Sequence, residues 1–371
     1  MLNSLLILIF IRPFISSLAF PYADSIYSLF LLIFLLCWIM AKGLPLKEIK
    51  SLKYPLLLFI CALLVSASLS YNKTAGLKEL LKYANYLLIF LVIVSLVDRE
   101  KTKIIRAIIL AGFIIGLLTI YQYFFGFRHL LDYISKQGIP NQFALDYVSR
   151  RRVFFPFVTP NALAGYLIML IPLTFIPRRK IWLLTPLVIS LFLTQSLGAF
   201  ISIFLGIIVY FRLQGKFKKR GLLILLALFA MAGIIFILKA ETQKQHLQPF
   251  FSMTMRLTYW QETFQIIKAH PLIGIGPGNF DLPRSRYAHN SYLQLWAETG
   301  IFGLLAFIWL ILSIIKSKLK SPLSDSRRAQ IAILLTSCIV FLIHNLIDFT
   351  FFLPEVSFIW YILSGLLFYY H

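Results

Sequence analysis

Charged side chains are scarce in this sequence of 371 residues, and acidic ones are the scarcest. Only 13% of the residues are charged, and 14 Asp and Glu stand against 36 Lys and Arg. A soluble domain carries roughly 25% charged residues, so the composition excludes an ordinary soluble protein. Because 60% of the residues are hydrophobic, the sequence instead predicts a polytopic membrane protein.

Cysteine is also scarce, which excludes a disulfide framework and a zinc site of the usual spacing. Cys37, Cys61 and Cys338 each lie inside an apolar stretch, so we expect them to pack against lipid or in the core. The N-terminus MLNSLLILIF has neither a basic leader nor a small-residue cleavage site. We interpret it as a retained first span and not as a signal peptide.

The net charge of +22 raises the question of nucleic-acid binding. Most of the Lys and Arg residues, however, lie in short runs at the ends of apolar stretches. This pattern orients helices in a bilayer, whereas a nucleic-acid surface gathers its cations on one soluble face. We therefore expect a membrane protein that binds no nucleic acid.

Apolar stretches long enough to cross about 30 Å of hydrocarbon predict an all-α fold of about twelve transmembrane helices in one membrane domain, residues 1–371. The seventh and eighth stretches are nearly contiguous, and we divide them at Gly198. The predicted spans lie near residues 3–20, 25–41, 54–71, 80–97, 104–124, 158–176, 181–196, 198–212, 221–238, 291–315, 331–347 and 356–370.

Every second connection between these spans is rich in cations, which places those connections and both termini in the cytoplasm. Two long segments then face outward, an outer loop at 125–157 and a larger one at 239–290 that runs into the span at 291–315. The cation-rich connections contain Lys42 to Lys53, Arg99 to Lys103, Arg178 to Lys180, Arg212 to Arg220 and Lys316 to Arg328.

The outer segment around residues 256–303 is polar for longer than any other part of the chain. Leu257, Trp260, Phe264 and Ile267 recur at spacings of three and four, which predicts an amphipathic helix over 254–269 on the membrane surface. Its opposite side would present Arg256 and Tyr259 to a substrate.

Arginine and histidine together in this segment suit work on a phosphate-bearing substrate. Arg256, Arg284 and Arg286 supply fixed positive charge, and His289 can exchange a proton near neutral pH. The alternative is a solvated loop whose arginines pair with lipid headgroups. Asn290 or Ser291 is expected to cap the following span.

Glycines 274, 276 and 278 surround Pro277 and predict a tight loop. No strand precedes them, so they are not a nucleotide fingerprint, and we expect no cofactor. The outer carboxylates are scattered and His289 has no acidic neighbour at ligand spacing, so the sequence predicts no metal site.

These motifs resemble those of the O-antigen ligase and O-antigen polymerase superfamily of bacterial envelope glycosyltransferases. The resemblance rests on R-x3-W, on H-P-L-x-G-x-G-P-G-N-F and on H-N-S-Y-L-Q-L-W-A-E-T-G-x-F-G. It extends to Arg151 or Arg152 ahead of Thr159-Pro160-Asn161, and to His344-Asn345-x2-Asp348. The family often has an arginine at the seventh-to-eighth junction, where this sequence has Leu197.

The resemblance implies transfer of a glycan from an undecaprenyl pyrophosphate carrier to a sugar hydroxyl, on the outer face of the bacterial inner membrane and without a metal. His289 is the expected base. His344 and Asp348, four residues apart on one predicted helix face, are either its support or a structural pair. The expected contacts to pyrophosphate or glycan are Arg256, Arg151, Arg152, Arg284, Arg286, Tyr259, Asn161 and Asn290.

Three functions stay open from the sequence. A ligase would move a finished polymer to a lipid A-core sugar or another glycan acceptor, and a polymerase would join repeat units with the same donor. A transporter for lipid-linked sugar would show charged residues in several spans and an internal repeat, and the sequence shows neither.

Overall fold

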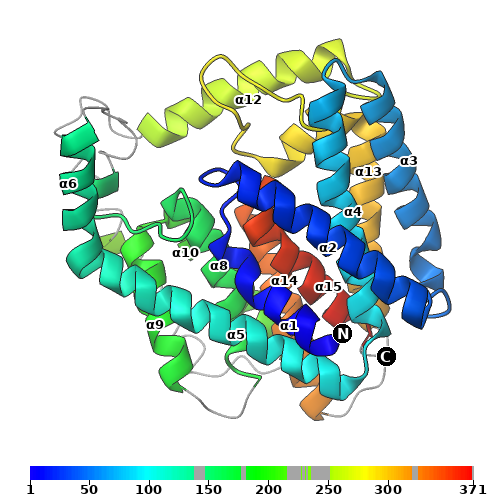
Figure 1. The fold of residues 1–371 in the computed structure, drawn as a ribbon, viewed down its shortest axis with the longest axis horizontal. Coiled ribbons are helices and arrows are strands. Elements are labelled where there is room, and N and C mark those ends of the chain that lie inside the picture. Colours follow the sequence, from blue (N-terminus) through cyan, green and yellow to red (C-terminus); the bar gives the residue numbers. More distant parts are fainter. Residues whose placement is uncertain are drawn as a thin grey trace.

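The apolar runs of the sequence form helices, because in hydrocarbon only a helix pairs every backbone N–H and C=O within its own segment. Figure 1 shows the resulting bundle, a computed structural model that describes residues 1–137, 147–176, 181–214, 251–319 and 325–369 and positions 227, 230, 233 and 234. Within these residues the only strand-like pairing is an isolated bridge between Leu282 and Ser285, so the all-α class is confirmed.

The helices follow the order of the predicted spans. They are α1 (Leu2–Ile11), α2 (Pro21–Lys42), α3 (Lys53–Leu69), α4 (Lys73–Ser95), α5 (Asp98–Tyr121), α6 (Phe127–Gln137), α8 (Pro160–Leu173), α9 (Ile181–Thr194), α10 (Leu197–Gln214), α12 (Phe251–Ala269), α13 (Ser291–Leu319), α14 (Asp325–His344) and α15 (Pro354–Tyr369), with short 3-10 turns η1 (Arg12–Phe14), η2 (Lys50–Leu52) and η4 (Thr350–Phe352) and a π-helical turn η3 (Gln122–Gly126).

Helix starts follow local signals in the sequence. The side chain of Asn72 accepts a hydrogen bond from the N–H of Ala75 and caps α4, and Thr159 caps α8 in the same way. Pro160 follows Thr159 at the first position of α8, where its missing N–H costs nothing. The side chain of Asn290 accepts from the N–H groups of Tyr292 and Leu293, so of the two predicted caps of α13, Asn290 and Ser291, it is Asn290 that caps the helix.

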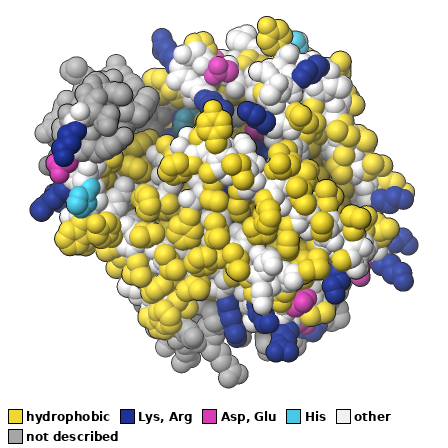
Figure 2. Space-filling model, viewed as in Figure 1, with side chains coloured by type: hydrophobic (Ala, Val, Ile, Leu, Met, Phe, Trp, Pro, Cys, Tyr) yellow, Lys and Arg dark blue, Asp and Glu magenta, His cyan; other side chains and the backbone are white. Residues whose placement is uncertain are grey.

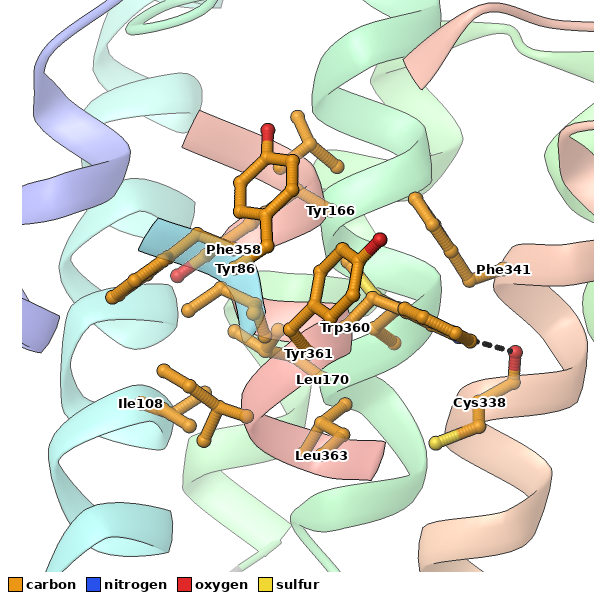
Figure 3. Close-up of a cluster of buried hydrophobic side chains, with 14 of the residues drawn as sticks. Tyr86, Ile108, Tyr166, Leu170, Cys338, Phe341, Phe358, Trp360, Tyr361 and Leu363 are labelled. Atoms are coloured by element: carbon orange, nitrogen blue, oxygen red, sulfur yellow. Dashed lines mark hydrogen bonds between the residues drawn. The ribbon is translucent and has the colours of Figure 1, made fainter. Parts of the chain in front are cut away.

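Helix α15 is the centre of the bundle, because its described side chains from Pro354 to Phe368 are buried on every face. Figure 3 shows its aromatic residues packed between α4 and α14. Tyr361 stacks on Tyr86 with ring centroids 4.6 Å apart, and the Trp360 indole N–H donates to the backbone carbonyl of Cys338 over 3.3 Å. The apolar side chains on every side of this helix suit the core position that it occupies.

The outside of the bundle is also apolar, as a bilayer requires. Figure 2 shows hydrophobic side chains over most of one face, with Lys and Arg gathered at the margins. On α2, Ile26 is 72% exposed and Met40 is 86% exposed. Of the described helices, six are long and apolar enough to cross a membrane, and shorter apolar helices are Leu2–Phe14, Pro160–Leu173, Trp182–Thr194 and Pro354–Phe368. The six are Pro21–Lys42, Lys50–Leu69, Asp98–Asp132, Leu197–Gln214, Ser291–Lys316 and Arg327–His344.

Most of the predicted spans therefore coincide with helices, but the number twelve stays a prediction. The ninth predicted span, residues 221–238, lies largely outside the described residues, as does the start of the outer segment at 239–250. The cysteines behave as expected, since Cys37 and Cys61 face outward and Cys338 is buried.

Two boundaries were wrong. The first span ends at Ile11, because Arg12 turns inward to an ion pair with Asp24 (2.6 Å) and Pro13 provides no N–H for a longer helix. The outer loop at 125–157 stays a prediction, and the structure shows that it contains the helix α6. The break between α9 and α10 falls at Gln195, which has a left-handed φ of 53°, and not at Gly198.

The turn between α3 and α4 lies at the same end of the bundle as the loop between α12 and α13. We call the end that carries α12 the site end; in Figure 1 it lies opposite the N-terminus. Contacts between distant segments define it. The backbone N–H of Asn72 donates to the side chain of Asn279 over 2.8 Å, and the hydroxyl of Ser66 donates to the carbonyl of Glu298 over 2.6 Å.

Helix α13 breaks at Gly300, where φ is 68° and ψ is −179°. The break frees two carbonyls, which accept hydrogen bonds of 2.9 Å from the N–H groups of Ile275 and Gly276, and Ile301 N–H donates to the carbonyl of Pro271. The glycine-rich loop is thus joined to the break through its backbone.

We predict that Gly300→Ala destabilises the protein more than Gly43→Ala does. Both glycines have the backbone conformation that strains other residues by about 1–3 kcal/mol, with φ of 68° and 82°. A Cβ at Gly300 would lie 1.9 Å from the carbonyl oxygen of Leu272, whereas a Cβ at Gly43 would meet nothing within 4 Å. Thermal unfolding of both variants in detergent measures the difference, and equal melting temperatures would contradict the close contact at Gly300.

Candidate active site

Helix α12 lies across the site end of the bundle and supplies two of the predicted site residues (Figure 1). The predicted helix at 254–269 is confirmed, but its predicted apolar residues do not all face the same environment. Leu257 and Phe264 are 47% and 42% exposed, whereas Ile267 is buried in a small core with Phe280 and Leu282. The bundle side of α12 therefore carries both apolar and polar groups, and the exposed apolar side chains face away from the bundle.

His289 lies where the loop meets the first turn of α13. Its ring stacks on Tyr259 of α12 with centroids 5.5 Å apart and meets the edge of Phe349 at 4.7 Å. Its Nδ1 is buried and makes no hydrogen bond with the described residues. The ring is thus held by aromatic contacts, and no structural hydrogen bond from the described residues occupies Nδ1.

A charged pair lies beside this ring. The Arg256 guanidinium is 3.9 Å from Oδ2 of Asp348, longer than a hydrogen bond, and Asp348 is 1% exposed. Burial lowers the pKa of His289 to about 4; Asp348 acts in the opposite direction and Arg256 reinforces the effect. At neutral pH the imidazole is therefore uncharged.

Asp348 is held by a network around Asn345. The hydroxyl of Ser291 donates to Oδ1 of Asn345 over 2.6 Å and to the carbonyl of Asp348 over 3.1 Å. The same Oδ1 accepts from the N–H of Phe351 and from the hydroxyl of Thr350. This buried amide joins the start of α13, the end of α14 and η4, and so fixes the backbone near Asp348, whose carboxylate Oδ1 accepts from the N–H of Phe349 over 2.9 Å.

The expectation that His344 and Asp348 share a helix face is wrong, because α14 ends at His344 and Asp348 follows a turn. His344 is 1% exposed and lies close to α8 and α10. A Cβ at Gly165 would be 3.1 Å from its Cδ2, and a Cβ at Gly198 would be 3.7 Å from its Nδ1. His344 is thus deep in the bundle, where the backbone of α8 and α10 closes over it.

The two candidate arginines before α8 take different positions. Arg152 Nε donates to the carbonyl of Thr194 over 3.0 Å, and its guanidinium reaches Oδ1 of Asn161 over 3.4 Å. Arg151 is exposed, and its guanidinium lies over the ring of Tyr123. Arg152 therefore lies at the junction of α9 and α10, the region where the family arginine would have been and where Leu197 stands.

The remaining predicted residues are more peripheral. Arg284 and Arg286 are exposed on the loop, and the positive charge of Arg284 acts on the hydroxyl of Tyr259. The side-chain oxygen of Asn290 is used as the helix cap. In the parts of the chain that the structure describes, no group of three or more His, Cys, Asp or Glu side chains could hold a metal ion.

Sequence reasoning assigned no role to Gln294 and Glu298, although both belong to the quoted motif. They are 2% and 1% exposed, and they bond to each other over 3.0 Å. The signal that could have found them was an amide and a carboxylate inside an apolar span, where polar groups are costly and seldom accidental. The same signal is the one that singles out His344 and Asp348 in the sequence.

The geometry can perform proton transfer next to a bound anion. A neutral imidazole can take a proton, a carboxylate near it can stabilise the imidazolium, and a guanidinium can bind phosphate oxygens. Arg256, Tyr259, His289 and Asp348 come together on three separate segments, and Arg152, Asn161 and His344 form a second group where α8, α10 and α14 meet.

Comparison with known proteins agrees with the motifs. No curated protein sequence matches the chain. The model of one protein family, described as O-antigen ligase, matches residues 181–308, which include Arg256, Tyr259 and His289 but neither Arg152 nor Asp348. The family indicates a membrane enzyme of the glycosyltransferase type, a ligase or a polymerase. Over residues 181–308 the match confirms the resemblance of this chain to the O-antigen ligase superfamily.

Proposed function

We propose that this protein is an O-antigen ligase-like glycosyltransferase of the bacterial inner membrane. It would move a glycan from an undecaprenyl pyrophosphate carrier to an acceptor sugar hydroxyl at the outer face, without a metal ion. The observation that carries the proposal is the half-buried, neutral His289 between Tyr259 and Phe349, next to the Arg256–Asp348 pair. The site end is the place where a lipid-borne donor and a soluble or lipid-borne acceptor can meet.

His289 would remove the acceptor proton. Its low pKa makes it a weak base in the free protein, because the buried imidazolium lacks solvation and Arg256 repels it. A bound pyrophosphate would offset the charge of Arg256 and so raise the pKa of His289. The base would thus become stronger when the donor is in place, with Asp348 stabilising the imidazolium.

The arginines would hold the leaving pyrophosphate. Negative charge grows on this group as the glycosidic bond breaks, and a guanidinium binds two phosphate oxygens in a fixed fork. Arg256 is 3.9 Å from Asp348, beyond hydrogen-bond distance, and a bound phosphate would compete with this carboxylate for the guanidinium. Arg152, Arg284 and the exposed Arg151 and Arg286 would extend the cationic surface along the carrier.

A polymerase that joins repeat units is the second candidate. It would use the same donor and the same base, and it differs in an acceptor that is itself lipid-linked. Both candidates need a large acceptor to reach His289 from outside, and α12 with its exposed apolar side chains would set the depth of that approach in the membrane surface. Assays with a lipid A-core acceptor and with a lipid-linked repeat unit separate them.

We expect Arg256→Lys to lose at least tenfold in glycan transfer although the charge is retained. A point charge cannot reproduce the two parallel hydrogen bonds of a guanidinium to phosphate. Transfer from a purified lipid-linked donor in proteoliposomes measures it. Arg106→Lys, a change of an exposed arginine on α5, is the matched control. Equal rates for Arg256→Lys and the wild type would contradict the two-oxygen contact.

We expect His289→Ala to lose about 10²–10⁴-fold in turnover while the donor still binds, since the loss of a general base leaves phosphate contacts in place.

In the wild type, kcat/KM for the donor should change less than twofold between pH 7.5 and 5.5, because a His289 pKa of about 4 keeps the ring neutral in this range. An ordinary histidine would lose roughly tenfold of its neutral fraction over the same interval.

EDTA should leave the rate of glycan transfer unchanged, and a loss of rate with EDTA would overturn the metal-free reaction.

We expect the site end to face outward and the termini to face the cytoplasm. In a chain without its three native cysteines, Asp281→Cys at the site end should react with an impermeant maleimide in intact spheroplasts, and Glu48→Cys at the other end should react only in broken cells. Both positions are exposed, so accessibility to the reagent depends on the side of the membrane alone. The reverse labelling pattern would place the site in the cytoplasm.

A further inference from the structure

Gln294 and Glu298 lie one turn apart on the same side of α13, in its first two turns. Both are buried, and both are polar groups inside a predominantly apolar helix. Groups of this kind persist only when they are hydrogen-bonded, because an unpaired amide or carboxylate in such surroundings is destabilising. The hydrogen-bond partners of the two side chains show which segments of the chain they connect.

The two side chains connect the glycine-rich loop to the residue before His289. The N–H of Gly278 donates to Oε2 of Glu298 over 3.2 Å, and Nε2 of Gln294 donates to Oε1 of Glu298 over 3.0 Å. Oε1 of Gln294 in turn accepts from the N–H of Ala288 over 3.2 Å. We call this chain of three hydrogen bonds the α13 relay.

The relay ends one residue before a strained position. His289 has a φ of 51°, in the left-handed region that side chains other than glycine rarely adopt. On its other side, Asn290 caps α13 and Ser291 donates its N–H to the carbonyl of Asn345. The backbone of His289 is therefore held from both directions, and its ring is directed between Tyr259 and Phe349 as a result.

The environment of Glu298 keeps the relay in place. Glu79 and Lys82 of α4 face it, and Lys82 also donates to the carbonyl of Phe352 over 3.2 Å. The backbone carbonyl of Glu298 is separately engaged by Ser66 and Gly276. The role of the Glu298 side chain is thus distinct from that of its backbone. The side chain accepts hydrogen bonds from the N–H of Gly278 and from the amide of Gln294.

We propose that Gln294 and Glu298 are positioning residues for His289, acting through the N–H of Ala288 to hold the imidazole in the place where it takes the acceptor proton. This assignment rests on the proposed glycan transfer for its catalytic meaning. Its structural part, the fixing of His289, stands on the three hydrogen bonds.

Donor and acceptor matching makes the relay testable. It needs an acceptor opposite Ala288, an acceptor opposite Gly278, and one donor between the two side chains. The natural pair satisfies this. The exchanged pair satisfies it too, because a carboxylate at position 294 accepts from Ala288 and an amide at position 298 provides the donor. With an amide at both positions one of them must face an N–H with its own NH₂ group, and with a carboxylate at both positions two oxygens face each other and repel once both groups are ionised.

The experiment compares Glu298→Gln, Gln294→Glu and the double exchange Gln294→Glu with Glu298→Gln. Ser66→Ala is the matched control, because it removes a hydrogen bond to the backbone of Glu298 and leaves the relay intact. Each variant is examined as the full chain in proteoliposomes for kcat and donor KM of transfer, and in detergent for thermal unfolding. His289 accessibility is measured as its rate of modification by diethyl pyrocarbonate, read by peptide mass spectrometry relative to the exposed His129.

We expect each single variant to lose at least tenfold in kcat with donor KM within twofold, and to label at His289 at least threefold faster. The double exchange should return both values to within threefold of the wild type. Ser66→Ala should unfold at a lower temperature but keep its kcat and its labelling rate. Single variants that retain normal kcat and labelling would overturn the proposal, as would a double exchange that restores neither, or losses in kcat that follow the unfolding temperature across all four variants.

Failure of the underlying function is distinguishable from failure of this inference. If the wild type transfers no glycan from the lipid-linked donor, the proposed function is wrong, and the labelling of His289 still decides whether the relay positions it.

Discussion

The site end of this protein depends on the break of α13 at Gly300. A helix in an apolar environment cannot leave carbonyls unpaired, so a break inside it requires partners from elsewhere in the chain. The loop at 271–276 supplies them through its own backbone N–H groups. Because that loop follows directly from α12, the same hydrogen bonds keep α12 near the bundle and bring Arg256 and Tyr259 over His289. The loop needs glycines for this close approach, as the positive φ angles of Gly274 and Gly276 show.

Buried polar groups at the site end are joined in networks that serve different purposes. Asn345 ties three segments together and contains no ionisable group, which makes it a structural centre. Arg12 is 1% exposed and pairs with Asp24 and Glu355, so it joins α1, α2 and α15. The Arg256–Asp348 pair differs from both because it lies beside a neutral histidine. A charged pair next to a candidate base suits an exchange of partners during a reaction.

Some residues of the site were predictable because their signal is local. Arg256 and Tyr259 share one side of a helix whose period is visible in the sequence, and Asn290 is a residue type that caps helices. His289 lies in a motif that resembles a family with its own histidine, and the family model covers this position. The pattern did not predict that the apolar residues of α12 would face different environments. Ile267 is buried because Phe280 and Leu282 form a small core with it.

The sequence by itself determined the helical membrane class, most of the helix positions and the segment that carries much of the candidate site, because hydrophobic length, periodicity and capping are properties of neighbouring residues. Only the tertiary structure decided that Arg152, and not Arg151, turns toward Asn161, that Asp348 leaves the helix of His344 to meet Arg256, and that Glu298 reaches Ala288 through Gln294. These outcomes depend on contacts between segments far apart in the chain. Such contacts are set by how buried donors, acceptors and charges find partners once the helices have packed, and no local pattern records that choice.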